Sequence, residues 1–245
     1  MTTVLTYLAL LAVTGAAWAH VVWMALTDEM AGMDMVMTPT FVDALAFVGA
    51  WAVMMAAMML PSALPMIGLY AAMQRTETSA LPRAAPVARF TLIYLGLWAV
   101  TGVPMYVASV ALSAIAADAR AYGVAAVLVV AGVFQLSPLK QVCLRRCRSP
   151  IGFLLGHWRA GWRGSLALGW SHATYCLGCC WALMVVLVAA GAMGLLWVLL
   201  VAAVVAAEKV LPGGEWIARA TGIALLVLGA AIVTRPGLAM TLRGV

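Results

Sequence analysis

Charge is what this sequence has least of. Of its 245 residues only 9% are Asp, Glu, Lys or Arg, whereas soluble proteins average about 25%. Hydrophobic residues make up 66% of the chain, and the mean hydropathy is +1.08. This composition excludes an ordinary soluble globular protein and predicts an all-α fold: a polytopic bundle of transmembrane helices that forms one integral membrane domain over residues 1–245.

Several functional motifs are also missing. The chain has no nucleotide-cofactor fingerprint and no paired carboxylates for acid–base chemistry, so an enzyme of this sequence would have to rely on a bound metal alone. The net charge of +6 comes from Lys and Arg in loops between apolar runs, a distribution that orients a membrane protein and does not indicate nucleic-acid binding. The five cysteines are an odd number, which favours metal or thiol chemistry over a disulfide framework.

About seven apolar segments are candidates to cross a bilayer, with six as the alternative count. They cover roughly residues 3–26, 42–73, 90–116, 121–136, 166–190, 195–208 and 216–233. The strongly basic loops at 74–89 and 137–164 are cytoplasmic by the positive-inside rule. This places the N-terminus inside, segment 27–41 outside, and the protein in a bacterial inner (cytoplasmic) membrane.

The most unusual stretch is GWSHATYCLGCCWALM, residues 169–184, in the middle of an apolar segment. In a helix, His172, Cys176 and Cys180 recur every four residues and Cys179 follows Cys176 by three, so one face carries an imidazole and thiols. These are the ligands that Cu(I) and Zn(II) prefer. The alternative is that three cysteines and a hydrogen-bonded histidine only pack in the core. Because such polar groups are rare in lipid, the pattern favours a metal or redox site.

A methionine group in MMAAMMLPSALPM occupies the segment at about 42–73, where Pro61 and Pro65 are expected to kink the helix. At about 1.5 Å per residue, this group and the His/Cys face both lie near mid-bilayer. We therefore predict that the two helices pack directly and place a methionine sulfur near His172 or Cys176, although a methionine stripe is also common core packing. The four methionines are Met54, Met55, Met58 and Met59.

Other soft ligands are secondary candidates. The loop 27–41 interleaves methionines with carboxylates, and thioethers select Cu(I). One Cys-x-x-x-Cys pair lies among arginines, which should lower the thiol pKa values. An Ala-x-Ala sequence at 17–19 would fit signal cleavage leaving a histidine at the new N-terminus, but no Lys or Arg precedes the apolar run. These candidates are His20, Met24, Met30, Met33, Met35, Met37, Cys143 and Cys147.

A resemblance to a known family rests on four segments taken together. They are AMMLPSALPM, LKQVCLRRCRSP, WRGSLALGWSHATYCLGCCWALM and AAEK. From about Trp51 to Leu228 the chain resembles an uncharacterised bacterial family of predicted metal-binding integral membrane proteins, sometimes labelled copper chaperone. The resemblance implies metal binding by the same Cys, His and Met residues.

Three functions are consistent with these features. The first is a membrane protein that binds or delivers a soft metal, copper rather than zinc, through Met, His and Cys in the bundle core. The second is a subunit of a copper-dependent membrane oxidase or monooxygenase acting on a small lipophilic substrate. The third is an assembly partner whose cysteines only pack. The expected partners are the lipid bilayer and either a membrane metalloenzyme or a periplasmic metal carrier.

Overall fold

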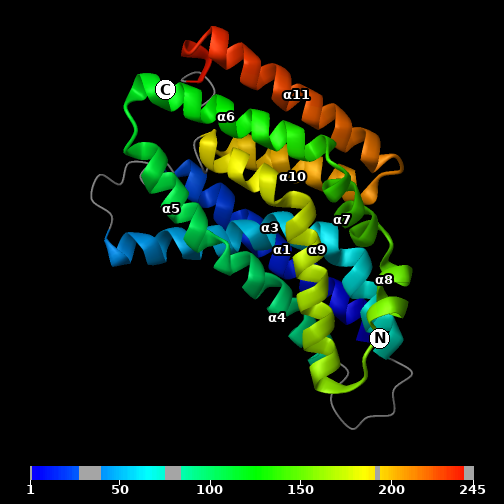
Figure 1. The fold of residues 1–245 in the computed structure, drawn as a ribbon. Helices are drawn as coiled ribbons and strands as arrows, with labels where there is room; N and C mark the ends of the chain where they lie inside the picture. The colour runs from blue at the N-terminus through cyan, green and yellow to red at the C-terminus, as the bar shows by residue number, and fades with distance from the viewer. Residues whose placement is uncertain (1, 28–39, 75–83, 191–193, 240–245) are drawn as a thin grey trace.

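The computed structural model describes residues 2–27, 40–74, 84–190 and 194–239, and every regular element within them is a helix. The predicted all-α bundle is confirmed (Figure 1). The helices are α1 (Thr2–Leu26), α3 (Phe41–Met73), α4 (Ala84–Val100), α5 (Gly102–Ser113), α6 (Ala117–Leu136), α7 (Pro138–Arg148), α8 (Pro150–His157), α9 (Gly161–Ala189), α10 (Leu195–Val210) and α11 (Gly214–Thr234).

Six stretches of the described chain are long and apolar enough to cross a membrane, as expected for a multi-pass membrane protein. One of them joins α4 and α5 into a single span of 30 residues. The remaining predicted span corresponds to α10, which has 16 residues, fewer than the roughly 20 that a hydrocarbon core requires. Six helical stretches of the described residues therefore have the length and composition of a span, and α10 is the shorter, seventh apolar segment of the predicted set.

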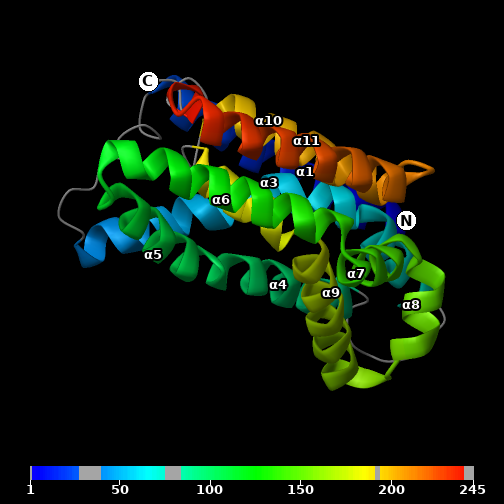
Figure 2. The same cartoon turned by 45° about the horizontal axis from the view of Figure 1, so that its top comes forward.

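Although α10 is short, it returns the chain to the end of the bundle where α7 lies. Glu208, near the C-terminus of α10, bonds to Lys140 in the first turn of α7. From there α11 runs back along α6 (Figure 2). The two ends of the chain consequently lie at opposite ends of the bundle (Figure 1).

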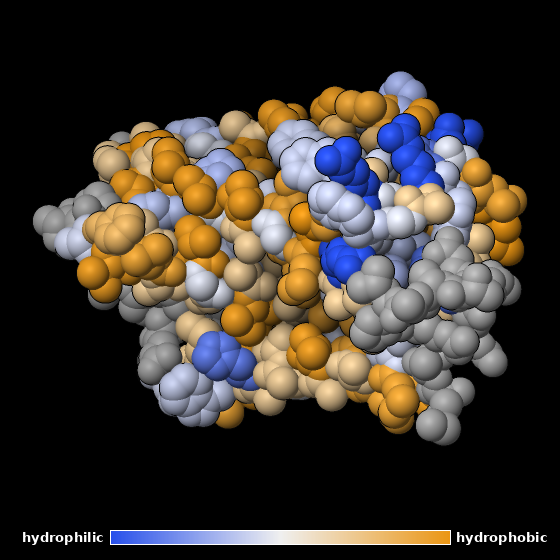
Figure 3. All heavy atoms as spheres, turned by 90° about the horizontal axis from the view of Figure 1, so that it is seen from below, coloured by the Kyte–Doolittle hydropathy of each residue, from blue (hydrophilic) through white to orange (hydrophobic). Residues whose placement is uncertain are grey.

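The surface is mostly apolar, as a membrane-embedded bundle requires. Figure 3 shows one face on which hydrophobic side chains predominate and hydrophilic ones gather mainly toward the end where α7 and α8 lie. The last turn of α7 carries three arginines. On this face the polar surface is therefore concentrated at one end of the bundle.

Helices α4 and α9 pack closely because Gly169 has no side chain. A Cβ atom at this position would lie 2.7 Å from the carbonyl oxygen of Phe90 on α4. The close approach brings the aromatic side chains of α4 against the His/Cys face of α9, as Phe90 and Tyr94 both stack near His172. A single glycine thus helps to position the central motif.

Gly169→Ala is expected to destabilise the protein by about 1–3 kcal/mol, because the added methyl group overpacks a helix interface made of backbone. Thermal unfolding of the purified protein in detergent measures the effect. Gly96→Ala on α4 is the matched control, since a Cβ there meets no atom within 4 Å and alanine is the better helix former. Equal melting temperatures for the two variants would contradict this account of the α4–α9 contact.

The predicted packing of the methionine helix on the His/Cys helix is not the main contact of either helix, and the predicted approach of a methionine sulfur to His172 or Cys176 remains a prediction. Helix α9 packs chiefly on α4, and α3 packs chiefly on α1 and α4. The two helices are connected instead by side chains from α4 and α10, described below. Helix α3 is continuous through Pro61 and Pro65. Both clusters are buried inside the bundle, but residue counting gives no information on which helices are neighbours.

Candidate metal centre

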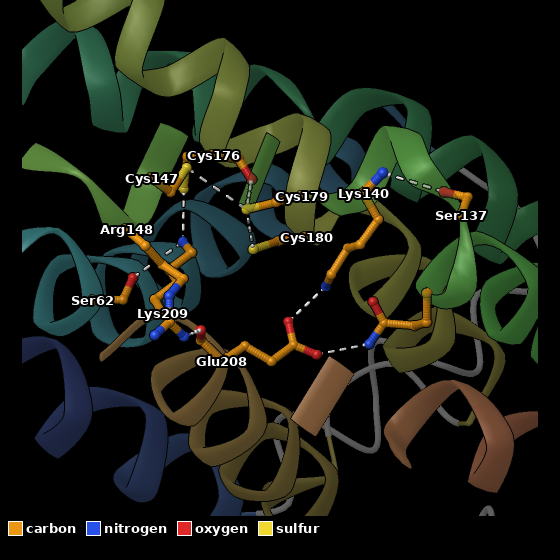
Figure 4. A network of polar contacts seen from close by, with 11 residues as sticks. Ser62, Ser137, Lys140, Cys147, Arg148, Cys176, Cys179, Cys180, Glu208 and Lys209 are labelled. Atoms are coloured by element: carbon orange, nitrogen blue, oxygen red, sulfur yellow. Dashed lines mark hydrogen bonds and ion pairs between the residues drawn. The ribbon is translucent and has the colours of Figure 1, made fainter. Parts of the chain in front are cut away.

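Four cysteines from two helices lie together in the bundle (Figure 4). We call Cys176, Cys179 and Cys180 of α9, with Cys147 of α7, the sulfur cluster. The Sγ atom of Cys179 lies 3.8 Å from that of Cys147 and 3.3 Å from that of Cys180. Cys179 also donates to the carbonyl oxygen of Cys176 at 3.1 Å. The three cysteines of α9 are fully buried, Cys147 is partly buried, and all five cysteines of the chain are free thiols.

Cys176 has polar partners from two further helices. The ammonium group of Lys209 on α10 donates to Cys176 Sγ at 2.9 Å and to the hydroxyl of Ser62 on α3 at 3.3 Å. The hydroxyl of Tyr94 on α4 lies 3.1 Å from Cys176 Sγ and donates to the carbonyl oxygen of Met59 on α3 at 3.3 Å. Helices α3, α4, α9 and α10 are therefore joined by polar contacts around a single sulfur atom.

The residue before Lys209 forms a second, adjacent network. The carboxylate of Glu208 accepts from Lys140 Nζ at 2.6 Å and from Gln135 Nε2 at 2.8 Å, and all three side chains are buried. Arg148 donates to the backbone carbonyl of Glu208 at 2.6 Å. The Glu208 carboxylate is neutralised by Lys140. It therefore does not compensate the charge of the neighbouring Lys209.

His172 lies beside the sulfur cluster in an aromatic pocket. Its ring centroid is 5.4 Å from that of Tyr94, 5.7 Å from that of Phe90 and 5.5 Å from that of Phe153. The imidazole is 3% exposed, and its Nδ1 atom has no hydrogen-bond partner among the described residues. An unsatisfied buried polar atom costs about 1–3 kcal/mol, so a ligand or a bound water at Nδ1 would stabilise the protein. The predicted role of His172 as a ligand remains a prediction.

The methionine group is part of the core. Its four side chains are 0–2% exposed, and the described contact with the centre is made by the backbone carbonyl of Met59. Their predicted coordination of the same ion remains a prediction. The four residues are Met54, Met55, Met58 and Met59.

The cysteine pair on α7 differs from the sequence-based interpretation. Burial raises the pKa of the Cys143 thiol, and hydrogen bonding to Cys176 raises that of the Cys147 thiol. The expectation that arginines would lower both pKa values is therefore wrong, because α7 packs against α9 and turns the thiols inward. Cys143 lies against Gly178, where a Cβ atom would be 2.9 Å from its sulfur. Only Cys147 joins the sulfur cluster.

The candidates near the N-terminus do not contribute to this centre in the described residues. On α1, Met24 is buried whereas His20 is exposed and stacks near Trp23, so the two side chains have different surroundings. Residues 28–39, which include the four loop methionines, lie outside the described part of the chain. Those methionines are Met30, Met33, Met35 and Met37.

Within the described ranges, no group of three or more His, Cys, Asp and Glu side chains is arranged to hold a metal ion. The closest approach to ligand geometry is the pair Cys147 and Cys179. With metal–sulfur bonds of about 2.3 Å, their 3.8 Å separation corresponds to an angle of about 110° at an ion. Cys180, at 3.3 Å from Cys179, would have to move away by about 0.5 Å to complete such a set. The cluster thus has two sulfurs at ligand spacing and two more within reach.

Sequence reasoning missed Lys209 and Tyr94. A lysine at the end of the apolar run of α10 was a usable signal, because ionisable residues in membrane segments are rare and face partners. The sequence segment AAEK contains this lysine, next to Glu208. Tyr94 gave no signal, since a tyrosine in an apolar helix is common.

The chain matches a known family over most of its length. The family model described as "PpoB2: Copper chaperone" matches residues 48–232, about three quarters of the chain. The chain belongs to this family. The match contains α4 to α10 entirely and most of α3 and α11, and therefore every helix that contributes to the sulfur cluster. No curated protein and no solved structure matches the chain.

Proposed function

We propose that the protein is a membrane copper chaperone that holds Cu(I) as cargo in the sulfur cluster. The observation that supports this most directly is the 3.8 Å separation of Cys147 and Cys179, two thiols from different helices at the spacing of two ligands on one ion. Thiolate sulfur selects Cu(I) over hard cations. The description of the family supports the same metal.

A site shared by two helices suits a protein that must both bind and release its cargo. Helix α7 has 11 residues and begins at Pro138, so its movement relative to α9 would separate Cys147 from the other three sulfurs. Cys147 is the partly buried member of the sulfur cluster, whereas the three cysteines of α9 are fully buried. The more accessible thiol therefore belongs to the shorter helix, α7. In this proposal copper enters and leaves past α7, and Cys179 passes it between Cys147 and the deeper thiols.

Copper binding needs a change in the centre, because thiolates and not thiols are the ligands. Cys179 donates to the Cys176 carbonyl and contacts Cys180, so a copper ion must replace these hydrogen bonds and displace the thiol protons. The alternative function, a copper-dependent oxidase or monooxygenase subunit, would require an open coordination position for oxygen. The buried sulfurs favour storage and transfer.

The test is copper retention. Purified wild-type protein reconstituted with Cu(I) under reducing conditions is expected to keep about one equivalent or more after desalting. The double variant Cys147→Ser/Cys179→Ser is expected to lose it, because serine oxygens are poor ligands for a soft ion. Elemental analysis gives the stoichiometry.

Cys143→Ser is the matched control, since it removes a buried thiol on α7 that lies outside the sulfur cluster. It is expected to retain copper at the wild-type level. Unchanged retention in the double variant, or equal loss in the control, would overturn the proposed site.

The orientation of this site in the cell is part of the proposal. With the basic end of α7 on the cytoplasmic side of an inner membrane, copper exchange past α7 would face the cytoplasm. The partner would then be a metal carrier or a metalloenzyme segment that presents soft ligands on that side. A partner approaching from the periplasm would meet the opposite end of the bundle.

A further inference from the structure

We propose, building on the proposed function, that Lys209 is the counter-ion of the loaded sulfur cluster and makes it selective for a monovalent thiophilic cation. The ammonium group lies 2.9 Å from Cys176 Sγ, and the residue is 9% exposed. A cation buried this deeply requires a nearby negative charge. The sulfur cluster is where that charge develops when a metal binds.

The buried carboxylate beside Lys209 is already paired with another cation. Glu208 and Lys140 neutralise each other in a buried pair. Among the described residues Lys209 makes no ion pair with a carboxylate, and its described partners are Cys176 and Ser62. Arg148, a further described cation of this network, is partly buried and donates to the carbonyl oxygen of Glu208. Lys209 is the cation that contacts the sulfur cluster directly.

Charge counting then favours a monovalent ion. Cu(I) held by two thiolates has a net charge of −1, and Lys209 brings the buried assembly to zero. Zn(II) with two thiolates would leave the assembly at +2 − 2 + 1 = +1, and with four thiolates at +2 − 4 + 1 = −1. Three thiolates would balance the charge, but zinc then needs a neutral fourth ligand, for which the candidate is the imidazole of His172. An uncompensated charge in a low-dielectric interior is strongly unfavourable, so neutrality favours the monovalent ion over zinc held by two or by four thiolates.

Lys209 is thus a positioning residue that acts through Cys176 and not a ligand, since an ammonium group has no lone pair. Its second hydrogen bond, to Ser62, orients the ammonium group toward the sulfur. Arginine at this position would keep the charge, glutamine would keep a hydrogen-bond donor without it, and methionine would remove both. These three replacements separate charge from hydrogen bonding.

The experiment measures Ag(I), a redox-stable stand-in for Cu(I), and Zn(II) binding to the purified full-length protein by chelator competition. Lys209→Met and Lys209→Gln are each expected to weaken Ag(I) binding by about a hundredfold or more, with Zn(II) binding unchanged or tighter. Lys209→Arg is expected to stay within about tenfold of wild type. Ser62→Ala, which keeps the charge, is expected to change Ag(I) binding by no more than about threefold.

The ratio of the two affinities distinguishes a charge role from a structural one. A damaged fold would weaken both ions alike, and such equal loss, or Ag(I) binding unaffected by Lys209→Gln, would overturn the inference. If Zn(II) binding is below detection in every variant, recovery of Ag(I) binding in Lys209→Arg but not in Lys209→Gln supports the counter-ion role, and failure of that recovery contradicts it. Wild-type protein that does not bind Ag(I) through its cysteines would overturn the proposed function itself.

Discussion

Lys140→Met and Glu208→Gln, made separately, are each expected to destabilise the protein by about 3–5 kcal/mol, the typical effect of removing one partner of a buried ion pair. Both side chains are buried, with exposures of 0% and 1%, and their charged atoms are 2.6 Å apart. Each single change leaves a charge in the bundle without its partner. In a chain of this size the melting temperature should fall by about 10 °C.

The double variant Lys140→Met/Glu208→Gln should recover most of this loss, because no unpaired charge remains and Gln135 can still donate to the new amide. Glu215→Gln is the matched control. This change breaks the ion pair between Glu215 and Arg145, whose side chains are 34% and 66% exposed, respectively. Exposed ion pairs contribute only about 0–1 kcal/mol to stability. Thermal unfolding in detergent ranks the four proteins. A double variant less stable than both single variants would show that the loss of stability in the single variants does not come mainly from an unpaired buried charge.

This pair also shows why part of the fold could not be read from the sequence. Lys140 belongs to a run of basic residues between two apolar segments, a pattern typical of a solvated cytoplasmic loop. Its partner Glu208 lies 68 residues further along the chain, and hydrophobic periodicity carries no information on such long-range pairs. The basic segment was therefore predicted as an exposed loop, whereas α7 packs into the bundle and buries Lys140, Cys143 and Leu144.

The helices and the main motif were predictable for a physical reason. Segments of about 20 apolar residues must form helices in lipid, because every backbone group has to be hydrogen-bonded within its own segment. Three cysteines and a histidine within such a segment stand out for the same reason. The neighbours of α9 were not predictable, because Gly169, Tyr94 and Lys209 determine them through close contacts and single hydrogen bonds. Cys147 was counted in a separate candidate pair because the docking of α7 was unknown.

Mild oxidation of the purified protein with diamide is expected to cross-link Cys147 to Cys179. Their sulfur atoms are 3.8 Å apart, and a disulfide bond of about 2.05 Å requires a small approach of α7 toward α9. The two thiols release two protons, and diamide takes up two protons and two electrons to give the hydrazine. Peptide mass spectrometry after proteolysis identifies the linked peptides, and the cross-link should form in most molecules.

Loading the protein with one equivalent of Ag(I) before oxidation is expected to suppress this cross-link by tenfold or more, because metal-bound sulfur is a poor nucleophile toward diamide. Cys143→Ser is the control that keeps the sulfur cluster intact, and it should give the same linked peptide. If Cys147 were instead found joined to Cys143, α7 would not lie on α9 as described. If Ag(I) gave no protection while the cross-link formed, the two thiols would be neighbours without being the copper ligands.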